Sequence, residues 1–316
     1  MLIAASPLEA AVSRLAKCTA WSYGPQRTSV AEPAAWAALA LLGHGRVDDA
    51  LPPALWLAEL QQSNGSVGIS ADLDEPRWCT SLAMLAWAAV DSANRQQRFA
   101  EPLANSARWA LAERGKTNPR DSRIGHDTTL AGWSWAADTH SWLEPTCFFV
   151  MGLRAAGFAT HPRVREGVRL VADRLLPAGG ANYGNTMVLG QTLVPHLQPS
   201  GIAMLTLAGE TAASDKRVAA SLDYLAANAK AATTPASLAF ALLGLTAHGR
   251  RPGDADRRLA RAIQFEGGPA SPDASAVLPP STYELALTLL AAEPAASWFA
   301  EFLVEPLLPL RQEANS

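Results

Sequence analysis

The chain has 316 residues, of which 49% are hydrophobic and 17% are charged, so it can bury a large core. Its net charge of -3, without a Lys/Arg cluster, gives no reason to expect nucleic acid or an anionic membrane as a partner. The three cysteines are widely spaced and form no CxxC pair, which argues against a disulfide framework. The chain shows neither a signal peptide nor an apolar run of the roughly 18–20 residues that a membrane span needs. We therefore expect a cytoplasmic protein without a transmembrane segment.

Six nearly all-apolar segments follow one another along the chain, and five of them begin at or near a proline. Proline suits the first position of a helix because that N–H has no intrahelical partner. Glycine follows most of these segments, as is typical just beyond a helix C-terminus. We predict helices at about residues 33–43, 79–90, 145–156, 199–208, 235–247 and 281–292.

Amphipathic segments alternate with the apolar ones, each with an apolar stripe at helical spacing and a charged opposite face. They cover residues 6–18, 48–62, 98–115, 162–176, 214–230 and 254–265. Because a helix that is apolar on every side must be buried on every side, the alternation predicts an all-α fold. The expected architecture is a single (α/α)₆ toroid over residues 1–316, with six parallel inner helices, six outer helices and a C-terminal helix from about Pro294 that closes the ring. The inner helices then start at one end, where we expect a site.

A loop motif recurs before the predicted inner helices. Its copies are "QQSNGSV" at residues 61–67, "QFEGGPA" at residues 264–270 and a copy without glutamine, "GGANYGN", from Gly179. These stretches resemble the Q-x-x-x-G-x-W repeat of squalene cyclases and protein prenyltransferases, with the tryptophan replaced in all three copies. The resemblance implies a terpene-cyclase-like or prenyltransferase-like toroid. Its expected partner is a hydrophobic, isoprenoid-type small molecule in an axial cavity.

The stretch Glu144-Pro145-Thr146-Cys147 resembles the frame in which squalene-type cyclases keep their catalytic acid, two residues before a threonine. The resemblance implies that Glu144 protonates an alkene or epoxide, without a cofactor. The acidic run that contains Asp72 and Asp74 is similar, more loosely, to the same motif, and these two residues are further catalytic candidates. In the structural alternative, Glu144 only satisfies first-turn N–H groups, as Glu32 would at another helix start.

Cyclisation through carbocations needs a dry cavity with π-rich walls. The candidate wall or substrate-binding residues are Trp36, Trp78, Trp133, Trp135, Trp142, Phe148, Phe149, Tyr183, Tyr283 and His196. Each aromatic residue could instead belong to the core.

Three other hypotheses remain open. In the first, Glu144, Cys147 and His196 hold zinc as in prenyltransferases. In the second, the toroid binds a small molecule or a protein partner without chemistry. In the third, the protein is an (α/α)₆ enzyme acting on glycans, which needs paired carboxylates such as Asp72, Asp74 and Glu144 could supply. The near absence of charge on the inner helices argues against the third hypothesis.

Overall fold

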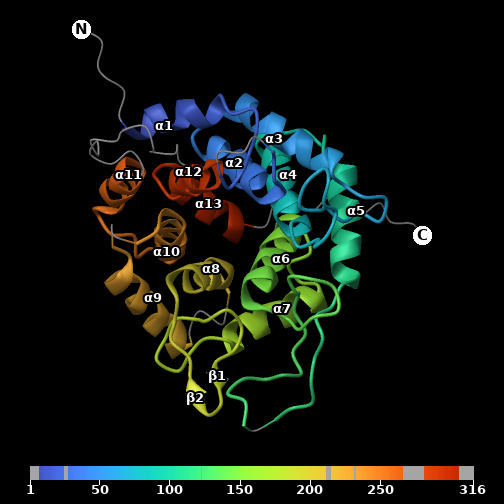
Figure 1. Cartoon of the computed structure of the whole chain (residues 1–316), viewed down its shortest axis with the longest axis vertical. Coiled ribbons are helices and arrows are strands. Elements are labelled where there is room, and N and C mark those ends of the chain that lie inside the picture. The colour runs from blue at the N-terminus through green and yellow to red at the C-terminus, as the bar shows by residue number, and fades with distance from the viewer. Residues whose placement is uncertain are drawn as a thin grey trace.

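The computed structural model describes residues 7–24, 28–121, 123–210, 215–230, 233–265 and 281–305. Its inner helices are α2 (Ala31–Gly43), α4 (Thr80–Asn94), α6 (Leu143–Ala155), α8 (Leu197–Leu207), α10 (Pro235–Ala247) and α12 (Thr282–Leu290). Its outer helices are α1 (Pro7–Ala16), α3 (Val47–Glu59), α5 (Ala100–Ala112), α7 (Pro162–Asp173), α9 (Lys216–Asn228) and α11 (Ala255–Phe265). Each inner helix packs on the next, and α12 packs back on α2, so the ring is closed (Figure 1). The predicted all-α (α/α)₆ toroid is confirmed.

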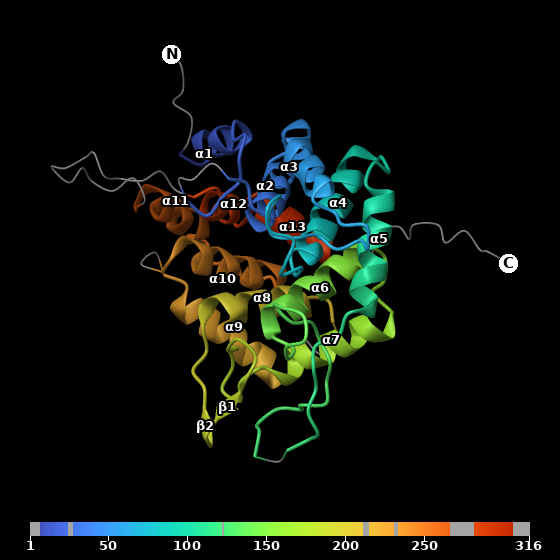
Figure 2. The same cartoon turned by 45° about the vertical axis from the view of Figure 1, so that its right-hand side comes forward.

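The two ends of the ring differ. At the end where the inner helices start, long loops project, among them the antiparallel hairpin of β1 (Met187–Val188) and β2 (Gln191–Thr192) (Figure 2). At the other end, helix α13 (Ala295–Val304) contacts α2, α6, α8, α10 and α12. It lies against the C-terminal ends of these helices: a Cβ on Gly43, the last residue of α2, would meet Ala295. The helix expected to close the ring thus closes one of its two ends.

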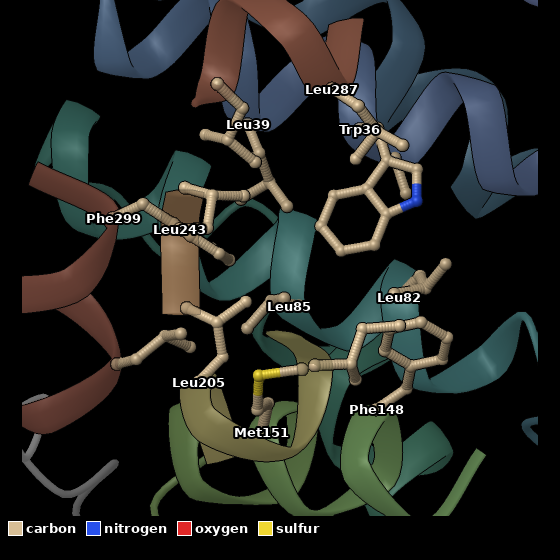
Figure 3. Close-up of a cluster of buried hydrophobic side chains, with 14 of the residues drawn as sticks. Trp36, Leu39, Leu82, Leu85, Phe148, Met151, Leu205, Leu243, Leu287 and Phe299 are labelled. Carbon is tan, nitrogen blue, oxygen red and sulfur yellow. The ribbon is translucent and has the colours of Figure 1, made fainter. Parts of the chain in front are cut away.

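Large side chains fill the interior of the ring. Trp36 makes edge contacts with Phe148, Phe240 and Phe299, with ring centroids 5.5–6.4 Å apart. Around them pack aliphatic side chains from every inner helix, all of them buried (Figure 3). The labelled members are Trp36, Leu39, Leu82, Leu85, Phe148, Met151, Leu205, Leu243, Leu287 and Phe299. Along this stretch, the axis that we expected to hold an apolar ligand is occupied by the protein's own core.

The recurring loop motif has a structural role in its first copy. The side-chain amide of Gln61 donates to the carbonyl of Pro102 at 2.7 Å and to the hydroxyl of Ser106 at 2.9 Å, which ties the loop to α5. Gly65 has a φ of +93°, and a Cβ there would lie 2.4 Å from the carbonyl oxygen of Asn105. The motif therefore encodes a tight turn packed on the next outer helix. Most of the copy at residues 264–270 lies outside the described residues.

A hydroxyl in the first turn of three inner helices binds the loop before it. The Thr80 hydroxyl accepts from the N–H of Val67 at 2.8 Å, and that of Thr146 accepts from the N–H of Trp133 at 3.0 Å. The Ser200 hydroxyl likewise accepts from the N–H of Ala181 at 2.8 Å. The threonine that resembled part of a cyclase motif is thus one copy of a repeated loop clamp.

Within the described ranges, no single helix is long and apolar enough to cross a membrane; only the bent pair α12 and α13 passes that test together.

Candidate active site

Two glutamates lie in the first turns of α2 and α6, at the end of the ring where the inner helices start. Glu32 and Glu144 are each the second residue of their helix, directly before a proline. Their exposed fractions are only 8% and 5%. The N-cap residues Val30 and Trp142 make no side-chain capping bond, and the two carboxyl groups accept hydrogen bonds from other side chains. The purely capping interpretation therefore does not account for their surroundings.

The Glu32 carboxyl group accepts two hydrogen bonds. The Tyr23 hydroxyl donates to Oε2, and the Trp36 indole N–H donates to Oε1 at 3.2 Å. Burial raises the pKa of Glu32 to about 7, and these two donors counteract part of that rise because they favour the ionised form. A carboxylate supported in this way is suited to act as a base or a nucleophile.

The Glu144 carboxyl group has weaker support. The side-chain amide of Gln198, which holds the corresponding position on α8, donates to Oε1 at 3.2 Å. Burial raises the pKa of Glu144 to about 7, and the negative charge of Glu32 adds to the rise. Glu144 is therefore the member of the pair that more readily keeps a proton at neutral pH, as a general acid must.

Tyr283 belongs to the same cluster. Its ring contacts that of Tyr23 at a centroid distance of 5.0 Å. Burial raises the pKa of Tyr283 strongly, and the charges of Glu32 and Glu144 both raise it further. Its hydroxyl therefore stays protonated and lies within electrostatic reach of both carboxyl groups. The structure thus brings together two carboxyl groups from helices on either side of α4, with a neutral phenol near both.

The other predicted wall residues divide between the rim and the core. Trp142 and Tyr183 are 39% and 42% exposed, Trp78 and Trp135 are partly exposed, and His196 is exposed beside the Tyr183 ring. The remaining four are buried at 0–2% exposure: Trp36, Trp133, Phe148 and Phe149. Aromatic rings are therefore available to a ligand at the rim of this end, whereas the rings deeper in the molecule pack against one another.

Asp72 and Asp74 lie on the exposed loop between α3 and α4. This loop packs on the start of α2, since the N–H of Ala31 donates to the carbonyl of Ile69 at 2.8 Å. Within the described part of the chain, neither aspartate has a hydrogen bond to Glu32 or Glu144 through its side chain. Both stay predictions, placed at the right end of the ring but outside the buried pair.

The zinc hypothesis is not supported. Among the described residues, no group of three His, Cys, Asp or Glu side chains could hold a metal ion. Cys147 is fully buried one turn along α6 from Glu144, and His196 is exposed next to Tyr183. The three predicted ligands therefore do not converge.

Glu32 is not among the catalytic residues that the sequence predicts. The available signal was its position: "EP" opens both α2 and α6, which in a ring of parallel helices places both carboxyl groups at one end. In the structural alternative, this equivalence indicates helix capping. It is equally the arrangement that a pair of acids requires.

No family model matches the chain, and no curated protein matches it. Solved structures do. A glycosidase in complex with glucose aligns with a TM-score of 0.61 and 12% identity, over 90% of this chain and 96% of that chain. An alpha-amylase from Clostridium perfringens aligns with a TM-score of 0.59 and 10% identity, over 92% of this chain and 98% of that chain. An endoglucanase from Klebsiella pneumoniae, a family 8 glycosyl hydrolase, aligns with a TM-score of 0.57 and 14% identity. The alignment covers 94% of this chain and 100% of that chain.

These similarities correct the resemblance to terpene cyclases and prenyltransferases. The three solved structures named above, which align over nearly their whole length, are a glycosidase, an alpha-amylase and an endoglucanase. The expected isoprenoid-type partner, the cyclase or prenyltransferase activity and the purely ligand-binding alternative are therefore wrong. The physical reason is that the motifs on which the resemblance rested form turns and loop clamps, which a ring of paired helices needs whatever its ligand.

Proposed function

We propose that this protein cleaves glycosidic bonds, with Glu144 as the general acid and Glu32 as its partner carboxylate. The observation that carries the proposal is the buried pair itself. Two carboxyl groups, each with its pKa raised to about 7, lie at the same end of the ring, and the charge of Glu32 contributes to the raised pKa of Glu144. Paired carboxyl groups in different protonation states are what glycoside hydrolysis requires.

The roles follow from the hydrogen bonds. Glu32 accepts from both Tyr23 and Trp36, which supports its ionised form. Glu144 accepts from one neutral amide and feels the charge of Glu32, which supports its protonated form. When one carboxyl group of a coupled pair is ionised, its charge holds the proton on the other.

The reaction uses that single proton. Glu144 gives it to the glycosidic oxygen as the bond from that oxygen to the anomeric carbon breaks. The ionised Glu32 either takes a proton from the water that attacks the anomeric carbon or attacks this carbon itself, in which case water then releases the sugar. In both routes one water is consumed and one glycosidic bond is lost. The neutral Tyr283 can donate a hydrogen bond to a sugar oxygen between the two carboxyl groups.

Two further features support the proposal. The rings of Trp142 and Tyr183 are exposed at the rim, where they can pack against the C–H faces of sugar rings. The solved structures of similar fold include a glycosidase in complex with glucose, an endoglucanase and an alpha-amylase.

The test is to incubate the protein with soluble polysaccharides and to measure hydrolysis as the release of reducing ends. Carboxymethylcellulose and soluble starch are the first substrates, followed by xylan, chitosan, laminarin and polygalacturonate. Glu144→Gln and Glu32→Gln keep the size of the side chain and remove the titration, so each should lower the rate on the responsive substrate by about 10²–10⁴-fold. Glu101→Gln is the matched control, because Glu101 is exposed in the first turn of outer helix α5.

The proposal fails if the wild type releases no reducing ends from any of these substrates. It also fails if hydrolysis occurs and the two carboxyl variants retain the wild-type rate. Circular dichroism of each variant establishes that a lost rate does not reflect a lost fold.

A further inference from the structure

A cavity opens at the end of the ring where the inner helices start, and neither proposed catalytic residue lines it. It has a volume of about 250 Å³ and lies between the loop before α4, the end of α5 and the loop before α6. Its aromatic lining consists of Trp78, Trp109, Trp133, Trp135 and Phe149. We name it the side cleft. Its size is somewhat below the range of pockets for drug-sized ligands, which suits a single small ring.

The aromatic rings of the side cleft form a corner. Trp78 and Trp135 meet at 87° with centroids 4.8 Å apart, and both are partly exposed. Trp133 and Phe149 are stacked at 5.4 Å and buried, so they form a rigid floor. A ligand that enters can place one flat apolar face on a tryptophan and an edge against the other.

Charged groups of both signs surround these rings. Glu75 and Arg77 pair at 3.1 Å on one wall, and Glu113 and Arg114 lie on another. The Arg77 guanidinium has donors beyond the one that it gives to Glu75, and its Nε is buried without a partner among the described residues. Burial raises the pKa of Glu113, and the charge of Arg77 lowers it. Acceptors and donors are thus available around an apolar floor, with no net charge.

This combination selects a polyol ring. A hydrocarbon would offer no partner to the Glu113 carboxyl group or to the remaining donors of Arg77, and a strongly anionic ligand would meet as many carboxylates as guanidinium groups. A neutral sugar has an apolar C–H face for the tryptophans and a rim of hydroxyl groups that donate to Glu113 and accept from Arg77.

The side cleft is joined to the carboxyl pair through Trp78. This residue stands two positions before the clamp residue Thr80, as Glu144 does before Thr146. The Trp78 ring stacks on Phe148, whose ring contacts Trp36, the residue that donates to Glu32. Two ring contacts and one hydrogen bond therefore connect Trp78, which lines the side cleft, to Glu32.

We propose that the side cleft binds one ring of a neutral saccharide and serves as a subsite for the chain whose bond is cleaved at Glu32 and Glu144. The inference rests on the proposed function for the identity of its ligand. Binding in the side cleft does not itself require turnover, so the two proposals can be tested separately.

The test is to titrate the Glu144→Gln protein with cellotetraose and with maltotetraose and to measure binding by calorimetry and by tryptophan fluorescence. In this background, Trp135→Leu should weaken binding of the responsive tetrasaccharide by at least about fivefold, because an aromatic contact face is lost. Glu113→Gln keeps the shape of the cleft and serves as a second variant should Trp135→Leu fail to fold. The matched control is Trp298→Leu, a partly buried tryptophan on α13 at the closed end, which should leave the Kd unchanged.

The outcomes separate the proposals. Unchanged Kd in both Trp135→Leu and Glu113→Gln overturns the side-cleft inference, even if the wild type hydrolyses glycans. Binding that depends on Trp135, in a wild type that hydrolyses nothing, supports the side cleft as a saccharide site and overturns the catalytic proposal. No binding of either tetrasaccharide, in a wild type that hydrolyses the corresponding glucan, also counts against the side cleft.

Discussion

Arg154 at the closed end of the ring and Glu144 at the open end differ in how many hydrogen-bond partners their buried side chains have. At the closed end, the Arg154 guanidinium donates to the carbonyls of Thr206 at 2.8 Å and Leu303 at 2.6 Å and pairs with Glu210 at 3.6 Å. At the open end, the side chain of Glu144 has one amide donor, and its pKa rises to about 7. Polar groups with full sets of partners stabilise a fold. Groups left short of partners are the ones available to a substrate.

Histidines repeat this contrast. At the closed end, His44 binds the carbonyl of Leu289 and His248 binds that of Met204, both at 2.9 Å, so each ring links neighbouring inner helices. At the open end, His196 is exposed beside Tyr183. Under the proposed function, stability and chemistry therefore depend on opposite ends of the same helices. Substitutions at one end should then leave the other function untouched.

The largest effect is expected at the closed end. Phe299→Ala removes a fully buried ring that contacts Trp36 and should lower the free energy of unfolding by about 3–5 kcal/mol. The measurement is urea denaturation, accompanied by the hydrolysis rate at a temperature where the variant is folded. A rate that falls while the fold is intact would break the proposed separation of the two ends.

Arg154→Met should cost about 3 kcal/mol of unfolding free energy. The variant keeps most of the apolar stem but leaves the carbonyl of Leu303 and the carboxylate of Glu210 with fewer partners. Arg165→Met is the matched control, because Arg165 also pairs with Glu210, at 2.7 Å, but is 41% exposed. We expect the control to lose less than about 1 kcal/mol. Equal losses would show that the burial of Arg154 is not what matters.

The open end should instead make stability depend on pH. Because Glu144 has a pKa of about 7 in the folded protein and an ordinary value of 4.5, the folded state binds the proton more tightly. The contribution of Glu144 to the free energy of unfolding is therefore fully present below about pH 4.5. It declines as the pH rises through about 7, by at most about 3 kcal/mol. Glu144→Gln should reduce the decline in thermal unfolding measured from pH 5 to pH 8, while the part due to Glu32, whose pKa is also raised to about 7, remains. A variant curve parallel to that of the wild type would contradict the assignment.

The smallest effect concerns the loop clamps. Thr146→Val keeps the shape of the side chain but removes the hydroxyl that binds the N–H of Trp133, and should cost about 1–2 kcal/mol. Thr206→Val is the control, since the Thr206 hydroxyl donates to the carbonyl of Ile202 within its own helix, at 3.0 Å, and hydrogen-bonds Cys147 rather than a preceding loop. Chemical denaturation of both variants measures the difference, and a larger loss in the control would refute the clamp.

The fold could be predicted because its signals are local. A proline at the first turn, a glycine beyond the last turn and an apolar surface on all sides each follow from the conformation or burial of one helix. The function could not be predicted in this way. The frame of Glu144 and Thr146 resembled a catalytic motif, but the threonine repeats a contact that Thr80 and Ser200 also make.

The site depends on which helix starts come together, and that is a property of the whole ring. Glu32 and Glu144 are far apart in sequence, and nothing next to Glu32 distinguishes it from a helix cap. The side cleft likewise requires the loops before α4 and α6 to meet. These loops have no periodicity from which their course could be predicted.

The closure of the ring by α12 against α2 has a consequence for how the protein is made. The first inner helix to leave the ribosome, α2, cannot pack against α12 until the last inner helix has been synthesised. Helix α13, which covers the closed end, is synthesised later still. Until then, the flank of α2 that faces α12 exposes an apolar surface to the cell. A nascent chain that stops before Thr282 should therefore be held by chaperones or aggregate, whereas release of the last two helices completes the fold in one step.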